Sequence, residues 1–315
     1  MDGAMPEQDA WWFNEPPAGI DRHGKEFEQV FTVYPWTLAL YSDIELQWNR
    51  YGTVAAIAAI LWPWVPLACC GLYLIAVFVG VRVMSTRKAV QVKPTWRCWN
   101  LALSIFSLVG AVRTVPHLAM LVARYGVHLA TCSIPTDVGS SWGIGVCGLW
   151  VMLFVMSKIP ELGDTVFIVL GKKKLLFLHW YHHVTVLLFC WHSYSTRSSS
   201  GLWFITMNYS VHAIMYFYYF LASFTGRRLK KLLAVVAPVV TCLQILQMFA
   251  GITVLAHVYR VKATGGLCHT DTANMWYGIL MYASYAVLFV YFAVERYCPC
   301  WKRKTSTTGK TTKAE

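Results

Sequence analysis

Residues 57–81 read IAAILWPWVPLACCGLYLIAVFVGV and contain no charged side chain. A helix needs about 20 apolar residues to cross the hydrocarbon core of a bilayer, so this stretch is long enough to span a membrane. The rest of the chain has the same character, because 57% of its 315 residues are hydrophobic and only 13% are charged. Ordinary soluble domains carry about 25% charged residues. The composition therefore excludes a cytosolic globular enzyme and a disordered protein.

Six further apolar stretches of similar length follow, which predicts an all-α membrane protein with seven transmembrane helices. The predicted spans are residues 57–81, 101–123, 142–170, 175–194, 202–223, 232–259 and 275–297. Two prolines, Pro63 and Pro66, predict a kink in the first span. We expect three parts: an N-terminal segment 1–50, a seven-helix domain 51–297 and a basic tail 298–315. The N-terminal segment is polar and lacks the apolar core of a cleavable signal.

Basic residues collect on one side of these spans. Of the 27 lysines and arginines, 18 follow the first, third, fifth and seventh spans. Because basic loops face the cytosol, this bias predicts a cytosolic C-terminus and, with an odd number of spans, a lumenal N-terminus. The net charge of +12 thus indicates membrane topology, and we expect no nucleic-acid partner.

The densest group of ionisable side chains within a span is His179, His182 and His183. Positions i, i+3 and i+4 share one face of a helix, so the three imidazoles point the same way. Ionisable groups are expensive in hydrocarbon, and each is therefore a candidate functional residue. A single histidine would more simply be a hydrogen-bonded core residue, but three on one face favour a site.

The third span carries Lys158, Glu161 and Asp164 near its cytosolic end. Lys158 and Glu161 share a helical stripe, and Asp164 lies close to it. Two interpretations remain open here. The three residues belong to the site, or Lys158 forms an ion pair with one of the acids that only stabilises the bundle.

Two later spans each carry a polar stripe. The members are His212, Tyr216 and Tyr219 in the fifth span, and Thr241, Gln244 and Gln247 in the sixth. Aromatic stripes usually pack and glutamines often bond between helices, but His212 favours a functional fifth span. At about 1.5 Å per residue, the polar groups of four helices reach one level in the cytosolic half, which predicts one polar site enclosed in the bundle. Arg113 in the second span completes that site or pairs with an acid.

Histidines in a membrane enzyme also suggest a di-iron desaturase or hydroxylase. Such a centre needs several histidine boxes, and this chain has one, so we expect no metal and favour acid–base and nucleophilic chemistry. A seven-helix transporter or receptor is a further alternative. It predicts ionisable groups spread along a pathway rather than clustered near the cytosol.

Four motifs together resemble the ELO family of very-long-chain fatty acid elongases. They are Lys158-x-x-Glu161-x-x-Asp164-Thr165, His179-x-x-His182-His183, His212-x-x-Met215-Tyr216-x-Tyr218-Tyr219 and Thr241-x-x-Gln244-x-x-Gln247. The resemblance runs from about Trp48 to the C-terminus. Trp180, the run Met207-Asn208-Tyr209 and the ending Lys310-Thr311-Thr312-Lys313-Ala314-Glu315 are most similar to the elongase 6-like branch, which extends saturated and monounsaturated acyl-CoAs.

The resemblance implies the condensing step of elongation in the endoplasmic reticulum membrane, with acyl-CoA and malonyl-CoA as substrates and no cofactor. It implies His182 as the acyl carrier, with His183 and His179 in support. Oxyanion donors would come from His212, Asn208 or Gln244. Cytosolic cations would hold the CoA phosphates, although the topology rule alone also accounts for them; they are Lys172, Lys173, Lys174, Arg227 and Arg228.

Cys132 and Cys268 fall in predicted lumenal loops, where an oxidising compartment permits a disulfide. Spacing alone leaves two free thiols equally open, and the resemblance favours the bond. The resemblance also implies partner enzymes, namely a 3-oxoacyl-CoA reductase, a 3-hydroxyacyl-CoA dehydratase and an enoyl-CoA reductase. It leaves a homodimer as a candidate assembly.

Overall fold

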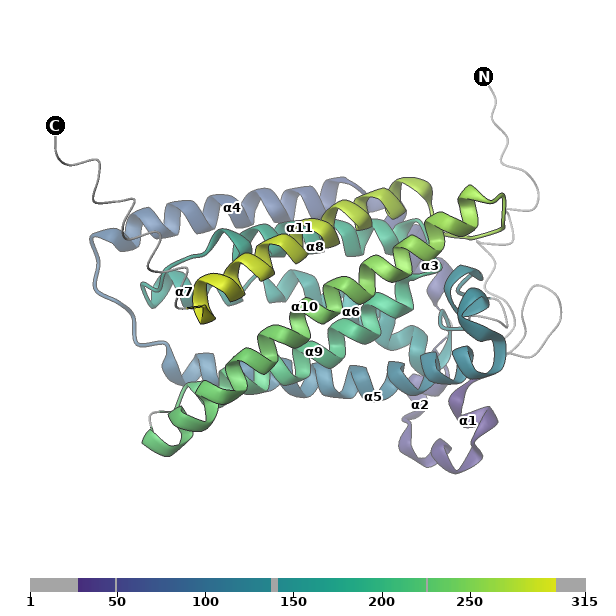
Figure 1. Ribbon diagram of the computed structural model, residues 1–315, viewed down its shortest axis with the longest axis horizontal. Coiled ribbons are helices and arrows are strands. Elements are labelled where there is room, and N and C mark those ends of the chain that lie inside the picture. The colour runs from purple at the N-terminus through teal and green to yellow at the C-terminus, as the bar shows by residue number, and fades with distance from the viewer. Residues whose placement is uncertain (1–27, 49, 137–140, 225, 299–315) are drawn as a thin grey trace, which may run out of the picture.

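The computed structural model describes residues 28–48, 50–136, 141–224 and 226–298. Within these ranges the regular structure is entirely helical, as predicted. The elements are α1 (Val30–Val33), η2 (Pro35–Leu40), α2 (Asp43–Leu46), α3 (Tyr51–Leu61), α4 (Trp64–Ser85), α5 (Lys93–Cys132), α6 (Gly145–Glu161), α7 (Asp164–Leu170), α8 (Phe177–Ser195), α9 (Gly201–Ala222), α10 (Arg227–Ala263) and α11 (Thr272–Tyr297). The long helices lie side by side along the longest axis of the molecule, with the short α1 and α2 beside one end of α5 (Figure 1).

Five helical segments in the described part of the chain are long and apolar enough to cross a membrane. They are α4, α5, the α6–α7 segment, α10 and α11. The chain is therefore a multi-pass membrane protein. Helices α8 and α9 have 19 and 22 residues, so they are long enough but too polar to join this group. The predicted count of seven and the predicted orientation stay predictions.

Two predicted spans are interrupted rather than continuous. The first breaks at Trp62 and Pro63, so α3 ends at Leu61 and a separate helix, α4, begins at Trp64. A proline lacks the backbone N–H that would continue the helix, which explains a break where only a kink was expected. The third span begins later than predicted, at Gly145, and turns at residues 162–163 between α6 and α7. Pro160 weakens the end of α6 in the same way.

Helices α5 and α9 approach each other closely because small residues line their contact. A Cβ atom on Gly110 would fall 2.5 Å from ring carbons of Tyr209, so only glycine fits there. The Ser104 hydroxyl donates a hydrogen bond to the Ala213 carbonyl at 2.9 Å across the same contact. Small residues permit this kind of packing between membrane helices, where lipid and side chains are equally apolar.

A disulfide joins Cys132 at the end of α5 to Cys268 in the connection between α10 and α11, which confirms the predicted pairing. The two cysteines are 136 residues apart in sequence. Closing so long a loop stabilises the folded state by about 5 kcal/mol in the chain-entropy model. The His269 N–H donates to the Cys132 carbonyl at 3.0 Å and holds the same two segments together.

The N-terminal segment is helical where the structure describes it and packs beside α5 and α6. Its residues 1–27 lie outside the described part, as do residues 299–315 of the predicted basic tail. Glu45 on α2 accepts hydrogen bonds from Arg113 at 2.8 Å and from the Trp150 indole at 2.7 Å. Arg113 therefore pairs with an acid, which was the alternative to a place in the site.

Candidate active site

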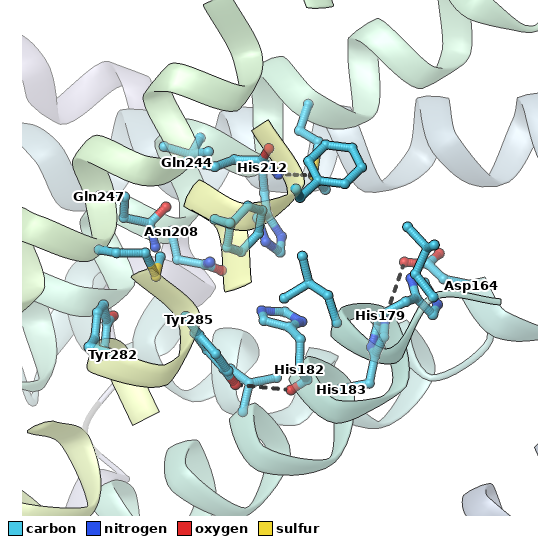
Figure 2. Close-up of a pocket in the computed structure, with 18 of the residues that line it drawn as sticks. Asp164, His179, His182, His183, Asn208, His212, Gln244, Gln247, Tyr282 and Tyr285 are labelled. Atoms are coloured by element: carbon cyan, nitrogen blue, oxygen red, sulfur yellow. Dashed lines mark hydrogen bonds and ion pairs between the residues drawn. The ribbon is translucent and has the colours of Figure 1, made fainter. Parts of the chain in front are cut away.

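A cavity of about 210 Å³ lies between α7, α8, α9, α10 and α11; we call it the histidine cavity (Figure 2). Its polar lining comes from all five helices and consists of Asp164, His179, His182, His183, Asn208, His212, Tyr216, Tyr219, Gln244, Gln247, Tyr282 and Tyr285. Ten of these twelve residues were singled out from the sequence. The predicted residues that line the cavity run from Asp164 to Gln247, so the fold brings together side chains that are up to 83 positions apart in the sequence.

The three histidines of α8 face the cavity because their spacing places them on one side of a regular helix. The ring centroids of His179 and His183 are 4.6 Å apart, and those of His182 and His183 are 5.5 Å apart at an interplanar angle of 82°. His183 is buried, whereas the ring of His182 points into open space in Figure 2. Each imidazole therefore has its own orientation and its own neighbours.

His179 is held by a hydrogen-bonded chain that leaves the cavity. Its Nε2 atom lies 2.9 Å from the Thr165 hydroxyl, which in turn lies 2.7 Å from the Tyr73 hydroxyl on α4. Thr165 is fully buried. These hydrogen bonds fix the His179 ring against α7 and α4, so His179 is suited to positioning the other histidines.

Asp164 begins α7 and has a partner on each carboxylate oxygen. Trp99 donates to Oδ1 at 2.5 Å, and the Tyr216 hydroxyl donates to Oδ2 at 2.7 Å. His183 Nε2 lies 4.0 Å from the same Oδ2 atom, which is too long for a hydrogen bond but close enough for an electrostatic contact. Asp164 is therefore held rigidly and would stabilise positive charge on His183.

His182 is positioned through its backbone and leaves its ring available. The Tyr285 hydroxyl donates to the His182 carbonyl at 3.2 Å and lies 2.5 Å from the Thr185 hydroxyl. The rings of His182 and Tyr285 are 5.1 Å apart. Among the described residues, no protein group forms a hydrogen bond with the His182 imidazole nitrogens. These nitrogens can therefore meet a substrate in the cavity.

Lys158 and Glu161 form a buried ion pair beside the cavity rather than in its lining. Lys158 Nζ contacts both Glu161 carboxylate oxygens at 2.8 Å and lies 4.1 Å from the Phe154 ring centroid. It also donates to Asn208 Oδ1 at 3.3 Å, and Asn208 lines the cavity. The structure therefore contains the expected ion pair, and this pair also contacts the site through Asn208.

On the opposite wall, α9 and α10 contribute an imidazole and three amides. The rings of His212 and Tyr216 are nearly perpendicular, with centroids 5.3 Å apart. Gln244 donates to the sulfur of Met215 at 3.2 Å, which leaves its carbonyl oxygen open to the cavity. This wall faces the α8 histidines in Figure 2.

Several predicted binding residues lie outside the cavity. Thr241 donates to the Ala237 carbonyl and contacts the Tyr297 hydroxyl instead. Arg113 is more distant, at Glu45. The predicted phosphate-binding cations are exposed in the α7–α8 connection and at the start of α10: Lys172, Lys173, Lys174, Arg227 and Arg228. Lys172 is engaged by the Ser85 and Arg87 carbonyls, and Lys173 lies 4.1 Å from the Trp96 ring centroid.

Sequence reasoning missed four residues that shape the site. Trp99 on α5 bonds to Asp164, and Tyr73 on α4 bonds to Thr165. Neither helix carried a recognised motif. Tyr282 and Tyr285 line the cavity from α11. Their spacing of i and i+3 on one face was the available signal, but aromatic residues in a span more often pack.

A second, apolar pocket of about 50 Å³ adjoins the first. The two share Val186, Asn208, Met281 and Tyr282 in their linings. The apolar pocket continues along α8 past Cys190 and reaches Trp142 and Gly201 at the other end of the bundle. Twelve residues separate His182 from Tyr194 on α8, which corresponds to roughly 18 Å of helix. A long apolar chain attached at the histidines fits this direction.

The described residues contain a group of close metal-type ligands outside the histidine cavity. Within the described ranges, one group of at least three His, Cys, Asp or Glu ligand atoms lies close enough to hold an ion, namely His128, Cys132 and His257. That group lies near the disulfide, not in the cavity. The imidazoles on α8 are capable of hydrogen bonding, proton transfer and nucleophilic attack.

The fold and this site define a membrane-embedded enzyme with a polyhistidine cavity that opens into an apolar pocket. Residues 59–307 match the family described as ELO: GNS1/SUR4 family. The chain is 42% identical over 240 residues to very long chain fatty acid elongase 6 of Drosophila melanogaster, covering 75% of this chain and 72% of the relative. It is 40% identical over 244 residues to human very long chain fatty acid elongase 6, covering 78% and 86%.

A third relative, fatty acid elongase 3 of Trypanosoma cruzi, is 43% identical over 246 residues, which is 71% of this chain and 81% of the relative. The chain belongs to the ELO family, and the resemblance of its four motifs to that family is confirmed. It is accordingly a membrane acyltransferase of the condensing class in fatty acid elongation, working with acyl-CoA substrates.

Proposed function

We propose that the chain condenses a long-chain acyl-CoA with malonyl-CoA to give 3-oxoacyl-CoA, carbon dioxide and free CoA. The observation that carries this proposal is the open ring of His182 in a polar cavity that adjoins an apolar pocket. The reactive carbonyl of a fatty acyl thioester would lie at the histidines and its hydrocarbon tail in the pocket. Saturated and monounsaturated chains are the expected substrates, because the motifs resemble those of the elongase 6-like branch, the name that the fly and human relatives carry.

The first half-reaction is acyl transfer to His182. An imidazole nitrogen attacks the thioester carbonyl, the carbon–sulfur bond breaks, and CoA leaves as a thiolate that takes up a proton. The resulting acyl-imidazole stays reactive toward carbon nucleophiles. Asp164, 4.0 Å from His183, stabilises positive charge that develops on the His183 imidazole. The Thr165 hydroxyl holds the His179 ring on the same helix face.

The second half-reaction uses malonyl-CoA. Loss of carbon dioxide leaves an enolate, whose carbon attacks the acyl group as the carbon–nitrogen bond to His182 breaks. Donors on the opposite wall, His212 and Asn208, stabilise the developing oxyanion, and Gln244 serves in the same way only if its amide N–H leaves the Met215 sulfur. Lys158 holds the Asn208 amide at 3.3 Å and is thus a positioning residue. No cofactor is needed for this sequence of steps.

The same proposal includes the cellular setting. Seven helices would cross the endoplasmic reticulum membrane with α3 as an added lumenal helix, the N-terminus lumenal and the C-terminus cytosolic. Exposed Lys172–Lys174 and Arg227 would then face cytosolic CoA phosphates. The product is a 3-oxoacyl-CoA, so a reductase, a dehydratase and an enoyl reductase acting on CoA esters are the expected partners. A homodimer remains a candidate assembly.

The test is to incubate the purified protein with acyl-CoA alone. We expect release of CoA, a covalent acyl group that peptide mapping places on His182, and ping-pong kinetics once malonyl-CoA is added. His182→Ala should abolish CoA release. His192→Asn is a matched control, because His192 lies on the same helix but bonds Asn274 at the other end. An acyl group on Cys190, or CoA release only in the presence of malonyl-CoA, would remove His182 from this role.

A further inference from the structure

The disulfide that closes the far end of the bundle has two histidines beside it. His128 and Cys132 are four residues apart on the last turns of α5, and His257 projects from α10. The side-chain ligand atoms of all three residues lie within 4.8 Å of one another, and the His128 and His257 ring centroids are 5.8 Å apart. None of these histidines belongs to the histidine cavity or to the apolar pocket.

The backbone places the three side chains together for a local reason. Gly126 interrupts α5 with a φ of 79°, a value that favours glycine. The chain then resumes helical geometry, as the Thr131 hydroxyl bond to the Val127 carbonyl shows. Positions 128 and 132 therefore share one face of this last turn. That face meets α10, where residue 257 lies.

The histidines also lack a structural explanation. His257 Nε2 is buried and has no hydrogen-bond partner among the described residues. Burying a polar atom without a partner is unfavourable, and a bound ion would satisfy such an atom. His128 is exposed, so the group can be reached from solvent. Two imidazoles and a thiolate are the ligands that zinc prefers.

We propose that reduction of the Cys132–Cys268 disulfide creates a His128–Cys132–His257 site for zinc or a similar divalent transition metal. A dithiol reductant supplies two electrons and two protons, the sulfur–sulfur bond breaks, and two cysteine thiols form while the reductant becomes a disulfide. The metal then displaces the proton of the Cys132 thiol to solvent. Zinc with bonds of about 2.0–2.3 Å places tetrahedral ligand atoms roughly 3.4–3.6 Å apart. The ligand atoms here lie within 4.8 Å of one another, so binding requires the side chains to rotate toward a common centre.

The disulfide and the metal are alternatives, because both use the Cys132 sulfur. The disulfide ties α5 to the connection before α11, whereas the metal would tie α5 to α10 through His257. When the disulfide is reduced, a metal cross-link between α5 and α10 therefore replaces the covalent cross-link at this end of the bundle. It also slows re-formation of the disulfide, since the thiolate is occupied.

Two cysteine variants of the full-length protein in detergent separate this proposal from general loss of the disulfide. Both Cys268→Ser and Cys132→Ser remove the bond, but only Cys268→Ser keeps all three ligands. With Co²⁺ as the probe, Cys268→Ser should bind one ion per chain with a thiolate-to-cobalt charge-transfer band that zinc abolishes. Cys132→Ser should show no such band. Its affinity for cobalt should fall by more than roughly 10–100-fold, the loss that follows removal of a residue that only hydrogen-bonds to a metal ligand. Adding His257→Ala to Cys268→Ser should weaken binding similarly.

Equal cobalt affinity in the two cysteine variants would overturn the proposal, as would a charge-transfer band that His257→Ala leaves unchanged. A second measurement uses the wild-type chain in case the variants do not fold. After treatment with a phosphine reductant, zinc should protect Cys132 from alkylation while Cys268 is still modified, as read by peptide mass spectrometry. Equal alkylation of Cys132 with and without zinc would also refute the site.

Discussion

Trp142 should limit the length of the acyl chain that the protein extends. It is one of the largest fully buried side chains, and its ring lies at the end of the apolar pocket against Gly201. A Cβ atom on Gly201 would lie 3.5 Å from the indole, so the two residues close the pocket together. Replacing the indole with the smaller side chain of leucine should open space beyond the current end. Substrates that the wild type rejects for length should then fit.

The size of the effect follows from the burial of methylene groups. Each buried CH₂ contributes about 0.8 kcal/mol, so two added carbons that find apolar space contribute about 1.6 kcal/mol. At 1.36 kcal/mol per factor of ten, this corresponds to roughly a 15-fold gain in kcat/KM for the longer substrate relative to the shorter one. The preferred chain length should therefore shift upward by at least one two-carbon step in Trp142→Leu.

The assay is CoA release with malonyl-CoA across a ladder of acyl-CoAs that differ by two carbons. Trp191→Leu is the control, because Trp191 is also buried but lines neither the cavity nor the pocket. Both variants lose core packing, which costs a few kcal/mol of stability. Only Trp142→Leu should change the ratio of rates across the ladder. An unchanged ratio in an active Trp142→Leu protein would refute this view of the pocket.

Three further predictions concern other parts of the chain. Asp164→Asn removes the charge near His183, so kcat should fall roughly 100-fold with little change in the KM for acyl-CoA, as steady-state kinetics would show. Asn208-Tyr209-Ser210 is a glycosylation sequon inside α9, and endoglycosidase treatment should leave the gel mobility of the protein unchanged. Burial favours a higher pKa for Glu45, but hydrogen bonds from Arg113, the Ser42 backbone and Trp150 hold the pKa at about 2, below its ordinary 4.5. The ionised Glu45 therefore contributes its full stabilisation of the folded state above about pH 4.5, and this contribution, at most about 3 kcal/mol, is lost as the pH falls toward 2. The difference in unfolding free energy between wild type and Glu45→Gln should therefore shrink between pH 6 and pH 3.

Most helices could be predicted from the sequence because a bilayer imposes one length and one composition on each crossing. The predicted spans 175–194 and 202–223 lie within two residues of α8 and α9 at each end. The errors occur where a local residue overrides the apolar pattern, as at Pro63, or where a helix continues beyond the apolar run. Helix α5 begins at Lys93 and ends at Cys132, well outside 101–123, because polar residues at both ends remain compatible with a helix in water.

The site was predicted where its members share a helix face and was missed where they do not. Spacing alone placed His179, His182 and His183 together, and depth counting added the polar residues of α9 and α10. Spacing could not show that Trp99 reaches Asp164, because the two residues lie on different helices and are 65 positions apart in the sequence. It also could not decide between the two roles of Arg113, because its partner Glu45 lies in a short helix with no apolar signal.

The two helices that fall short of the membrane-span criterion are the two that carry most of the site. Helix α8 contributes three cavity histidines, and α9 contributes Asn208 and His212. Polar side chains lower the apolarity of a helix, but here they face the histidine cavity and each other. The cost of placing them in the bundle is therefore reduced by neighbouring helices. A span that is long enough but too polar, between spans that are clearly apolar, is thus itself a sequence signal for a buried site.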